Sequence, residues 1–148
     1  MKTKDTNPKD GIGIKKVPIS VLPTEVLAET GLALLEGAVK YGRHNYRVAG
    51  VRHSVYYDAV FRHLGAWWEG EDIDQDSGLS HVTKAIAGLM VLRDSMIMGN
   101  DVDDSPPKLK AGWVANYNKI AGDILGKHKK HCEPYTDKTC GKLPDKTK

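Results

Sequence analysis

The side chains best suited to chemistry lie in two stretches of the sequence, residues 36–47 and 54–81. The second stretch contains His63 and His81, and imidazole is the side chain that exchanges protons near neutral pH. The first stretch places lysine, arginine and histidine among tyrosines, which suits a phosphate attached to a flat base. Most of the ionisable side chains that could do chemistry therefore lie in these two stretches. A structural histidine and an ordinary solvated surface are the alternative interpretations.

An acidic turn over residues 69–76 contains five carboxylates in eight residues. Carboxylates at this density favour a hard cation such as Mg²⁺, Mn²⁺ or Ca²⁺. Asp72, Asp74 and Asp76 imitate the start of a calcium-binding loop, but Gly78 comes one residue late and Thr83 stands where the closing glutamate belongs. The turn is therefore not an EF-hand. A divalent-metal site that uses part of it stays open, as does a merely solvated turn.

Helical periodicity must position these groups, because no stretch alternates in the manner of a strand. We predict helices over residues 24–41, 54–70, 80–98 and 110–126. Thr24, Ser54 and Ser80 are the expected N-caps, and Gly42 and Gly99 the expected stops. The predicted fold is all-α: a small bundle of about four helices, with an extended N-terminal arm and a flexible basic C-terminal tail.

Large apolar side chains at helical spacing define the buried faces that we expect. The expected core residues of the first three helices are Leu27, Leu34, Leu35, Ala38, Tyr57, Phe61, Leu64, Trp68, Ala85, Leu89 and Leu92. Ala87 and Gly88 are small enough to let another helix approach closely. On the second helix Asp58 and Arg62 follow a different line, where an i,i+4 salt bridge and a functional role are both open.

Length and composition fit one domain in the cytosol. The chain has 148 residues, a net charge of +3 and 40% hydrophobic residues, and no apolar run reaches the roughly 20 residues of a membrane span. The N-terminus has no apolar segment typical of a secretory signal. We expect an arm over residues 1–20, a helical domain over 21–126 and a basic tail over 127–148.

The basic tail carries the two cysteines of the chain. We expect no nucleic-acid partner, because no aromatic residues are interleaved with its lysines. A zinc site is the alternative to a solvated tail with free thiols; its ligands would be His128, His131, Cys132 and Cys140. Their spacing matches no zinc motif.

Three separated motifs resemble a phage family, the dATP/dGTP diphosphohydrolase N-terminal domains. They are Asn7-Pro8-Lys9-Asp10, the EGAVKYGRHNYR segment from Glu36 and the DAVFRHLGAWWEGEDIDQDSGLSH segment from Asp58. The resemblance covers about residues 5–98. It implies MazG-like all-α chemistry in phage nucleotide metabolism, in the host cytoplasm: dGTP or dATP is hydrolysed to monophosphate and pyrophosphate. The chain lacks the EExxE motif of MazG-type enzymes, and its ExxD, Glu71 to Asp74, lies in a turn.

The resemblance also implies roles for individual residues. The candidate catalytic residues are His63, His81 and Glu71. The candidate nucleotide-binding residues are Lys9, Lys40, Tyr41, Asn45, Arg47, Arg62 and Trp67. The candidate ligands of Mg²⁺ or Mn²⁺ are Glu36, Asp58, Glu69, Glu71 and Asp74. We expect a nucleotide as the small-molecule partner, no membrane partner, and a homo-oligomer, either a dimer or a tetramer.

Two other functions compete with hydrolysis. A non-catalytic protein that sequesters a host immune signalling nucleotide, an anti-defence sponge, would need the cations and rings but no complete set of metal-binding carboxylates. A phage structural or interaction protein would need neither. Turnover, tight binding without turnover, and no binding of any nucleotide are the observations that separate the three.

Overall fold

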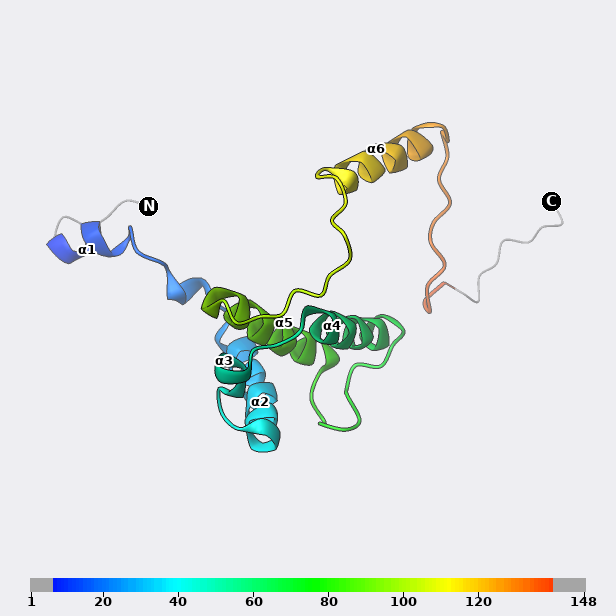
Figure 1. The fold of residues 1–148 in the computed structure, drawn as a ribbon. Coiled ribbons are helices and arrows are strands. Elements are labelled where there is room, and N and C mark those ends of the chain that lie inside the picture. Colours follow the sequence, from blue (N-terminus) through cyan, green and yellow to red (C-terminus); the bar gives the residue numbers. More distant parts are fainter. Residues whose placement is uncertain (1–6, 140–148) are drawn as a thin grey trace. The chain divides into compact units, whose positions relative to one another are not determined.

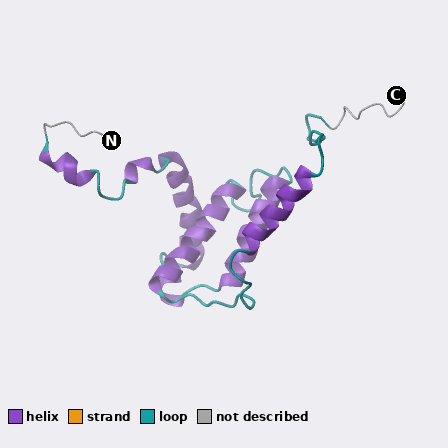
Figure 2. Ribbon diagram, turned by 90° about the horizontal axis from the view of Figure 1, so that it is seen from above, coloured by secondary structure: helices purple, strands orange, loops and turns teal. Residues whose placement is uncertain are grey.

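The regular structure of the described chain is helical. The computed structural model describes residues 7–139. Its elements are α1 (Pro8–Gly13), the short 3₁₀ helix η1 (Ile19–Val21), α2 (Thr24–Tyr41), α3 (Asn45–Ala49), α4 (His53–Trp68), α5 (His81–Met98) and α6 (Trp113–Gly126) (Figure 1). Within this range only helices and loops are drawn (Figure 2), which confirms the predicted all-α class. No helix in it is long and apolar enough to cross a bilayer.

Contacts along the chain divide it into two compact units, Met1–Pro106 and Pro107–Lys148. The first unit contains α1 to α5, and the second contains α6. The predicted arm, domain and tail, over 1–20, 21–126 and 127–148, stay predictions. Cys140 lies outside the described residues, and Cys132 is an exposed free thiol.

The start of the chain differs from the extended arm that the sequence predicts. Residues Pro8–Gly13 form α1 instead. Asn7 caps this helix, since its side-chain oxygen accepts a hydrogen bond from the Lys9 amide at 3.0 Å, and Pro8 occupies the first helical position. Asparagine before a helix and proline at its first residue are both favourable, and together they outweigh the turn preference of Asp10-Gly11.

Helix α5 is the element on which the first unit packs. It contacts α4 most extensively, and also α2 and α3. The predicted ends are confirmed: the Ser80 hydroxyl accepts from the Val82 amide at 3.2 Å, and Gly99 adopts the left-handed conformation that ends the helix. Close helix approach is confirmed as well, because a Cβ at Gly88 would lie 3.2 Å from a methyl group of Val60 on α4.

The core is made of smaller side chains than the apolar periodicity predicts. The buried apolar residues among those described are Ala33, Val51, Ala85, Ala87 and Val91. The predicted core line of α4, Tyr57, Phe61, Leu64 and Trp68, is exposed, and so are Leu27, Leu35 and Leu89. The opposite face of α4 packs against α5 instead, because the small side chains of α5 leave room for it.

Thr24 and Ser54 are not the helix caps that the sequence predicts. Pro23 precedes α2 without a side-chain cap, and α4 begins at His53. The first turn of α4 is instead held by Asp104, which accepts from the Ser54 amide at 2.9 Å and from the Ser54 hydroxyl at 2.5 Å. Because the carboxylate sits where helix amides are free, it stabilises the start of α4.

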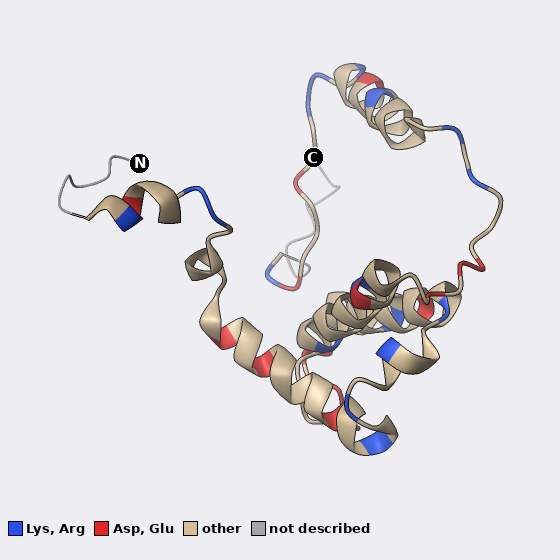
Figure 3. Cartoon of the chain, turned by 60° about the vertical axis from the view of Figure 1, so that its left-hand side comes forward, with Lys and Arg blue, Asp and Glu red and all other residues tan. Residues whose placement is uncertain are grey.

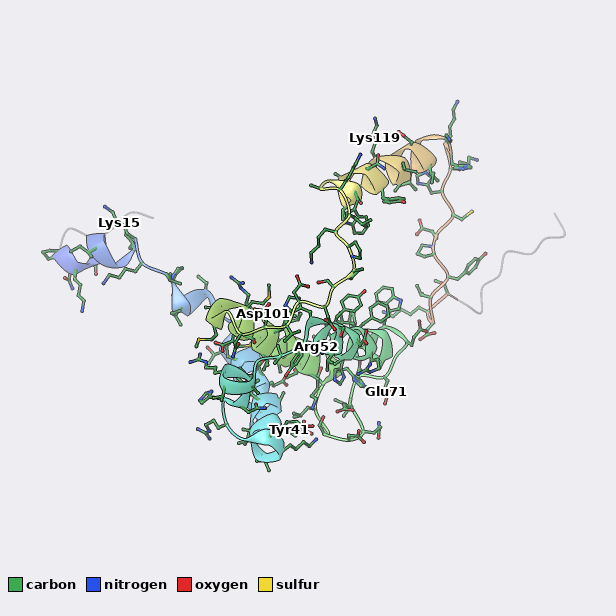
Figure 4. The ribbon with its side chains drawn as sticks, in the orientation of Figure 1. Lys15, Tyr41, Arg52, Glu71, Asp101 and Lys119 are labelled. Atoms are coloured by element: carbon green, nitrogen blue, oxygen red, sulfur yellow. The ribbon has the colours of Figure 1, made fainter. Side chains whose placement is uncertain are left out.

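The segment after α5 fixes the loop before α4. The His53 amide donates to the Val102 carbonyl at 3.0 Å, and the Val102 amide donates to the Val51 carbonyl at 2.8 Å. Arg52 and Asp101 consequently lie on two neighbouring segments of the chain (Figure 4). At Gly50 (φ +70°) a Cβ would overlap the Asn100 carbonyl oxygen, so this crossing requires glycine.

Candidate functional site

A cavity of about 660 Å³ lies in the first unit, between α2, α4, α5 and the loop that follows α2. Its apolar floor comes from small residues, including Ala38 on α2, Ala59 on α4 and Gly88 on α5. Small side chains leave room where helices cross, so the residues that permit close packing also create the space. The volume falls within the range of pockets that bind small molecules.

Rings and cations line the rim of this cavity. Tyr41 ends α2 (Figure 4), the loop after it contributes Arg43 and His44, and the start of α3 contributes Asn45 and Tyr46. Tyr56 and His63 come from α4, and Lys84 comes from α5. Burial raises the pKa of the Tyr56 phenol, so this ring stays neutral at physiological pH. Such a lining suits a flat base that carries a negatively charged group.

His63 and His81 form a hydrogen-bonded pair. Their Nδ1 atoms lie 2.8 Å apart, and only His63 lines the cavity. His81 is buried, and its Nε2 has no hydrogen-bond partner among the described residues, although Glu71 Oε1 lies 3.8 Å away. Burial, and then the neighbouring His81, lower the pKa of His63, so the imidazole is neutral near pH 7. The predicted catalytic residues therefore lie together, in the order Glu71, His81, His63.

Glu36 is held by two lysines. Lys40 Nζ lies 2.5 Å from one carboxylate oxygen, and Lys84 Nζ bonds to the other. Hydrogen bonds from Lys40 and then from Lys84 are the largest causes that lower the pKa of Glu36. Acidic residues recur along α2, and the basic Lys40 lies in its last turn (Figure 3). Glu36 thus holds the Lys84 ammonium at the wall of the cavity, where an anionic ligand can compete with Glu36 for this lysine.

The remaining predicted nucleotide-binding residues lie outside the cavity lining. Arg47 makes a two-pronged ion pair with Asp94, with both N–O distances 2.8 Å. Arg62 and Trp67 are exposed on α4, and Lys9 belongs to α1. Of the seven candidates, the structure brings Tyr41 and Asn45 to the cavity. The assignment of all seven as nucleotide-binding residues stays a prediction.

The five predicted metal ligands do not meet. Asp58 and Glu69 are exposed, Asp74 bonds to the Ser77 hydroxyl at 2.6 Å, and Glu36 is neutralised by its lysines. Among residues 7–139 no three His, Cys, Asp or Glu side chains are grouped so that they can hold a metal ion. The assignment of these carboxylates as ligands of Mg²⁺ or Mn²⁺ stays a prediction.

Five polar or aromatic lining residues are absent from the residues assigned from sequence: Arg43, His44, Tyr46, Tyr56 and Lys84. Helical spacing alone points to two of them. Tyr56 precedes His63 by seven residues and Lys84 follows His81 by three, so each shares a helix face with an assigned histidine. His44 follows Gly42, the stop of α2, and adopts a left-handed conformation with φ 61°.

Fold and cavity define an all-α protein with a basic, aromatic small-molecule pocket. The family described as "dATP/dGTP diphosphohydrolase, N-terminal" matches residues 6–105, and the chain belongs to this family. A "dATP/dGTP diphosphohydrolase" of Salmonella phage PMBT28 is 34% identical over 77 residues, which are 52% of this chain and 26% of the relative. The matching part thus spans about a quarter of that relative. No solved structure matches the chain significantly.

Proposed function

We propose that this chain binds a purine deoxynucleoside triphosphate in the cavity and hydrolyses it to the monophosphate and pyrophosphate. The observation that carries the proposal is the cavity lining, where rings, two cations and a neutral histidine with a hydrogen-bonded partner meet. Family membership and the name of the phage relative support dGTP or dATP as the substrate.

The histidine pair supplies the proton acceptor that hydrolysis needs. A carboxylate at Glu71 favours the tautomer in which His81 Nε2 carries the proton, since the two face each other at 3.8 Å. His81 Nδ1 then accepts a hydrogen bond from His63 Nδ1–H. His63 Nε2 carries no proton, so it can act as the base. Water attacks the α-phosphorus while His63 takes its proton, and the bond to the β-phosphate oxygen breaks as pyrophosphate leaves.

Arg43 and Lys84 balance the charge of the triphosphate. Lys84 leaves Glu36 for a phosphate oxygen, and Lys40 keeps the Glu36 carboxylate paired. Mg²⁺ or Mn²⁺ is required in this proposal as the counter-ion that arrives with the triphosphate. We also propose that the chain works as a homo-oligomer, a dimer or a tetramer, since many large apolar side chains of the first unit are exposed.

The test is incubation of the purified chain with dGTP or dATP in H₂¹⁸O, with and without Mn²⁺. The expected products are pyrophosphate and a monophosphate that carries the ¹⁸O label, because water attacks the α-phosphorus. His63→Gln should abolish turnover, whereas His128→Gln, a histidine of the second unit, should not. Label in the pyrophosphate, or equal turnover by wild type and His63→Gln, contradicts the proposed chemistry.

Sequestration of an intact nucleotide is the second candidate function. The pairing of Glu36 with two lysines favours it, because a neutralised carboxylate can release a cation to the ligand without any chemistry. Tight binding of a nucleotide that is recovered unchanged, in the presence of Mn²⁺, would establish this function and exclude hydrolysis.

A further inference from the structure

Three tyrosines of the cavity lining, Tyr41, Tyr46 and Tyr56, differ in what their hydroxyls can bind. Tyr41 is 72% exposed, so its phenol is open to bulk water. The Tyr46 hydroxyl lies 3.5 Å from His44 Nδ1, close enough for a weak hydrogen bond. Tyr56 is half-buried, and among the described residues no group hydrogen-bonds to its hydroxyl. Tyr56 therefore offers the phenol that is best placed to bind a molecule in the cavity.

The Tyr56 hydroxyl is accessible from the cavity. In the part of the chain that the structure describes, the fully buried side-chain nitrogen or oxygen that lacks a partner is His81 Nε2, and the Tyr56 oxygen is not such an atom. A tyrosine ring that is partly buried usually presents its hydroxyl to a hydrogen-bond partner. Since the ring of Tyr56 lines the cavity, a bound ligand can supply that partner.

The Tyr56 phenol meets such a ligand as a neutral donor. Burial, and then the neighbouring Tyr41 and Tyr46, raise the pKa of Tyr56, so the hydroxyl keeps its proton at physiological pH. A neutral O–H group suits an uncharged acceptor, such as a ring nitrogen of a base. The phosphates have stronger partners in the cations Arg43 and Lys84, which line the same cavity.

The position of Tyr56 on α4 matches the base end of a nucleotide. Tyr56 and His63 both line the cavity and lie seven residues apart, on one face of the helix. Seven residues span about 10.5 Å along the helix axis. The proposed function places the α-phosphorus beside His63, so Tyr56 faces the other end of the ligand, where the base lies.

The two purines share one acceptor that a single donor can recognise. Guanine and adenine both carry the acceptor N7, whereas at position 6 guanine has an acceptor and adenine a donor. Pyrimidines have no N7. A neutral donor directed at N7 therefore binds both purines equally well and makes no equivalent bond to cytosine or thymine.

We infer that Tyr56 is the specificity-determining residue of the cavity, whose hydroxyl donates a hydrogen bond to N7 of the base and so selects purines over pyrimidines. This inference rests on the proposed function for the placement of the phosphates beside His63 and Lys84. It adds the contact that recognises the base, which the family description and the name of the phage relative do not specify.

Calorimetric titration with deoxynucleosides tests this contact without turnover, because these ligands carry no phosphate. Replacement of N7 by carbon, in 7-deaza-deoxyguanosine and 7-deaza-deoxyadenosine, should weaken binding to the wild type about tenfold. Tyr56→Phe should bind deoxyguanosine about tenfold more weakly than the wild type does, and should not distinguish it from its 7-deaza analogue. Tyr57→Phe removes a hydroxyl from a side chain of α4 that is 65% exposed, and should behave as the wild type.

Equal binding of deoxyguanosine and its 7-deaza analogue by the wild type overturns the inference. A preference for N7 that persists in Tyr56→Phe, or no binding of any of the four nucleosides, overturns it as well. The wild-type comparison needs no variant, so it remains decisive if Tyr56→Phe fails to fold. Pyrophosphate release from dGTP is measured in parallel. Turnover without an N7 effect rejects the Tyr56 contact alone, and an N7 effect without turnover rejects hydrolysis alone.

Discussion

Replacing Lys84 with methionine removes a positive charge from the cavity and changes the shape of the cavity little. The substitution keeps the length of the side chain, and it leaves Glu36 paired with Lys40 at 2.5 Å, so the helices should fold as before. A hydrogen bond to a charged group contributes about 1.5–3 kcal/mol, which corresponds to roughly ten- to a hundredfold in affinity. Since Lys84 must leave Glu36 to reach a phosphate, we expect a loss near the lower end of this range.

Calorimetric titration with dGTP and with deoxyguanosine gives the measurement. Lys84→Met should weaken dGTP about tenfold and leave deoxyguanosine unchanged, because the nucleoside has no phosphate. Arg93→Met removes one charge from an exposed position on the same helix and should change neither titration. An unchanged dGTP affinity, or an equal loss for nucleotide and nucleoside, would refute the placement of the phosphates beside Lys84.

Three further predictions concern proton transfer and the contacts that hold the cavity walls. The acid limb of the pH–rate profile should fall below the ordinary histidine pKa of 6.5, because the pKa of His63 is lowered and activity needs its neutral form; a limb above 6.5 would contradict this. Asp104→Asn should lower the melting temperature at neutral pH. The Ser54 contacts lower the pKa of Asp104, so its contribution is complete above the unfolded value of 3.8 and is lost as the pH falls through the lower folded value. The melting temperatures of variant and wild type should therefore converge in acid, and a constant difference would exclude the Asp104 carboxylate as the cause. Asn100→Ala should cost about 1–3 kcal/mol of unfolding free energy in urea, because the side chain accepts from Ser95 and donates to two carbonyls of α3; an unchanged midpoint would show that this anchor is dispensable.

Local signals of the sequence predict the four long helices α2, α4, α5 and α6, and two residues that line the cavity. Ser80, Gly42 and Gly99 mark helix ends through their own backbone and hydroxyl chemistry, so their effect needs no distant partner. The segment from Glu36 reaches the cavity through Tyr41 and Asn45, because a helix stop at Gly42 turns the chain back across the helix end. The two histidines were separate candidates for proton transfer in the sequence, and the structure places them in contact.

Contacts between residues far apart in the sequence determine the rest of the fold and of the site, and no local pattern in a single sequence reveals these contacts. Two lines of side chains on α4 have helical spacing, and the line with the larger apolar residues resembles a core face. The other line packs inward instead, because the small residues Ala87 and Gly88 leave room for it. Arg47 forms its ion pair with Asp94, 47 residues away, and the side chain that caps α4 is that of Asp104. Each of these pairings follows from the packing of α5 rather than from any local pattern.

A crystal structure with a dGTP analogue whose α,β-bridging oxygen is replaced by an imido group tests the central claim most directly. The account predicts the base among the tyrosines of the cavity, with Lys84 Nζ within about 3 Å of a phosphate oxygen and released from Glu36. An analogue bound elsewhere on the chain, or a cavity that stays empty at millimolar analogue with Lys84 still on Glu36, would contradict it.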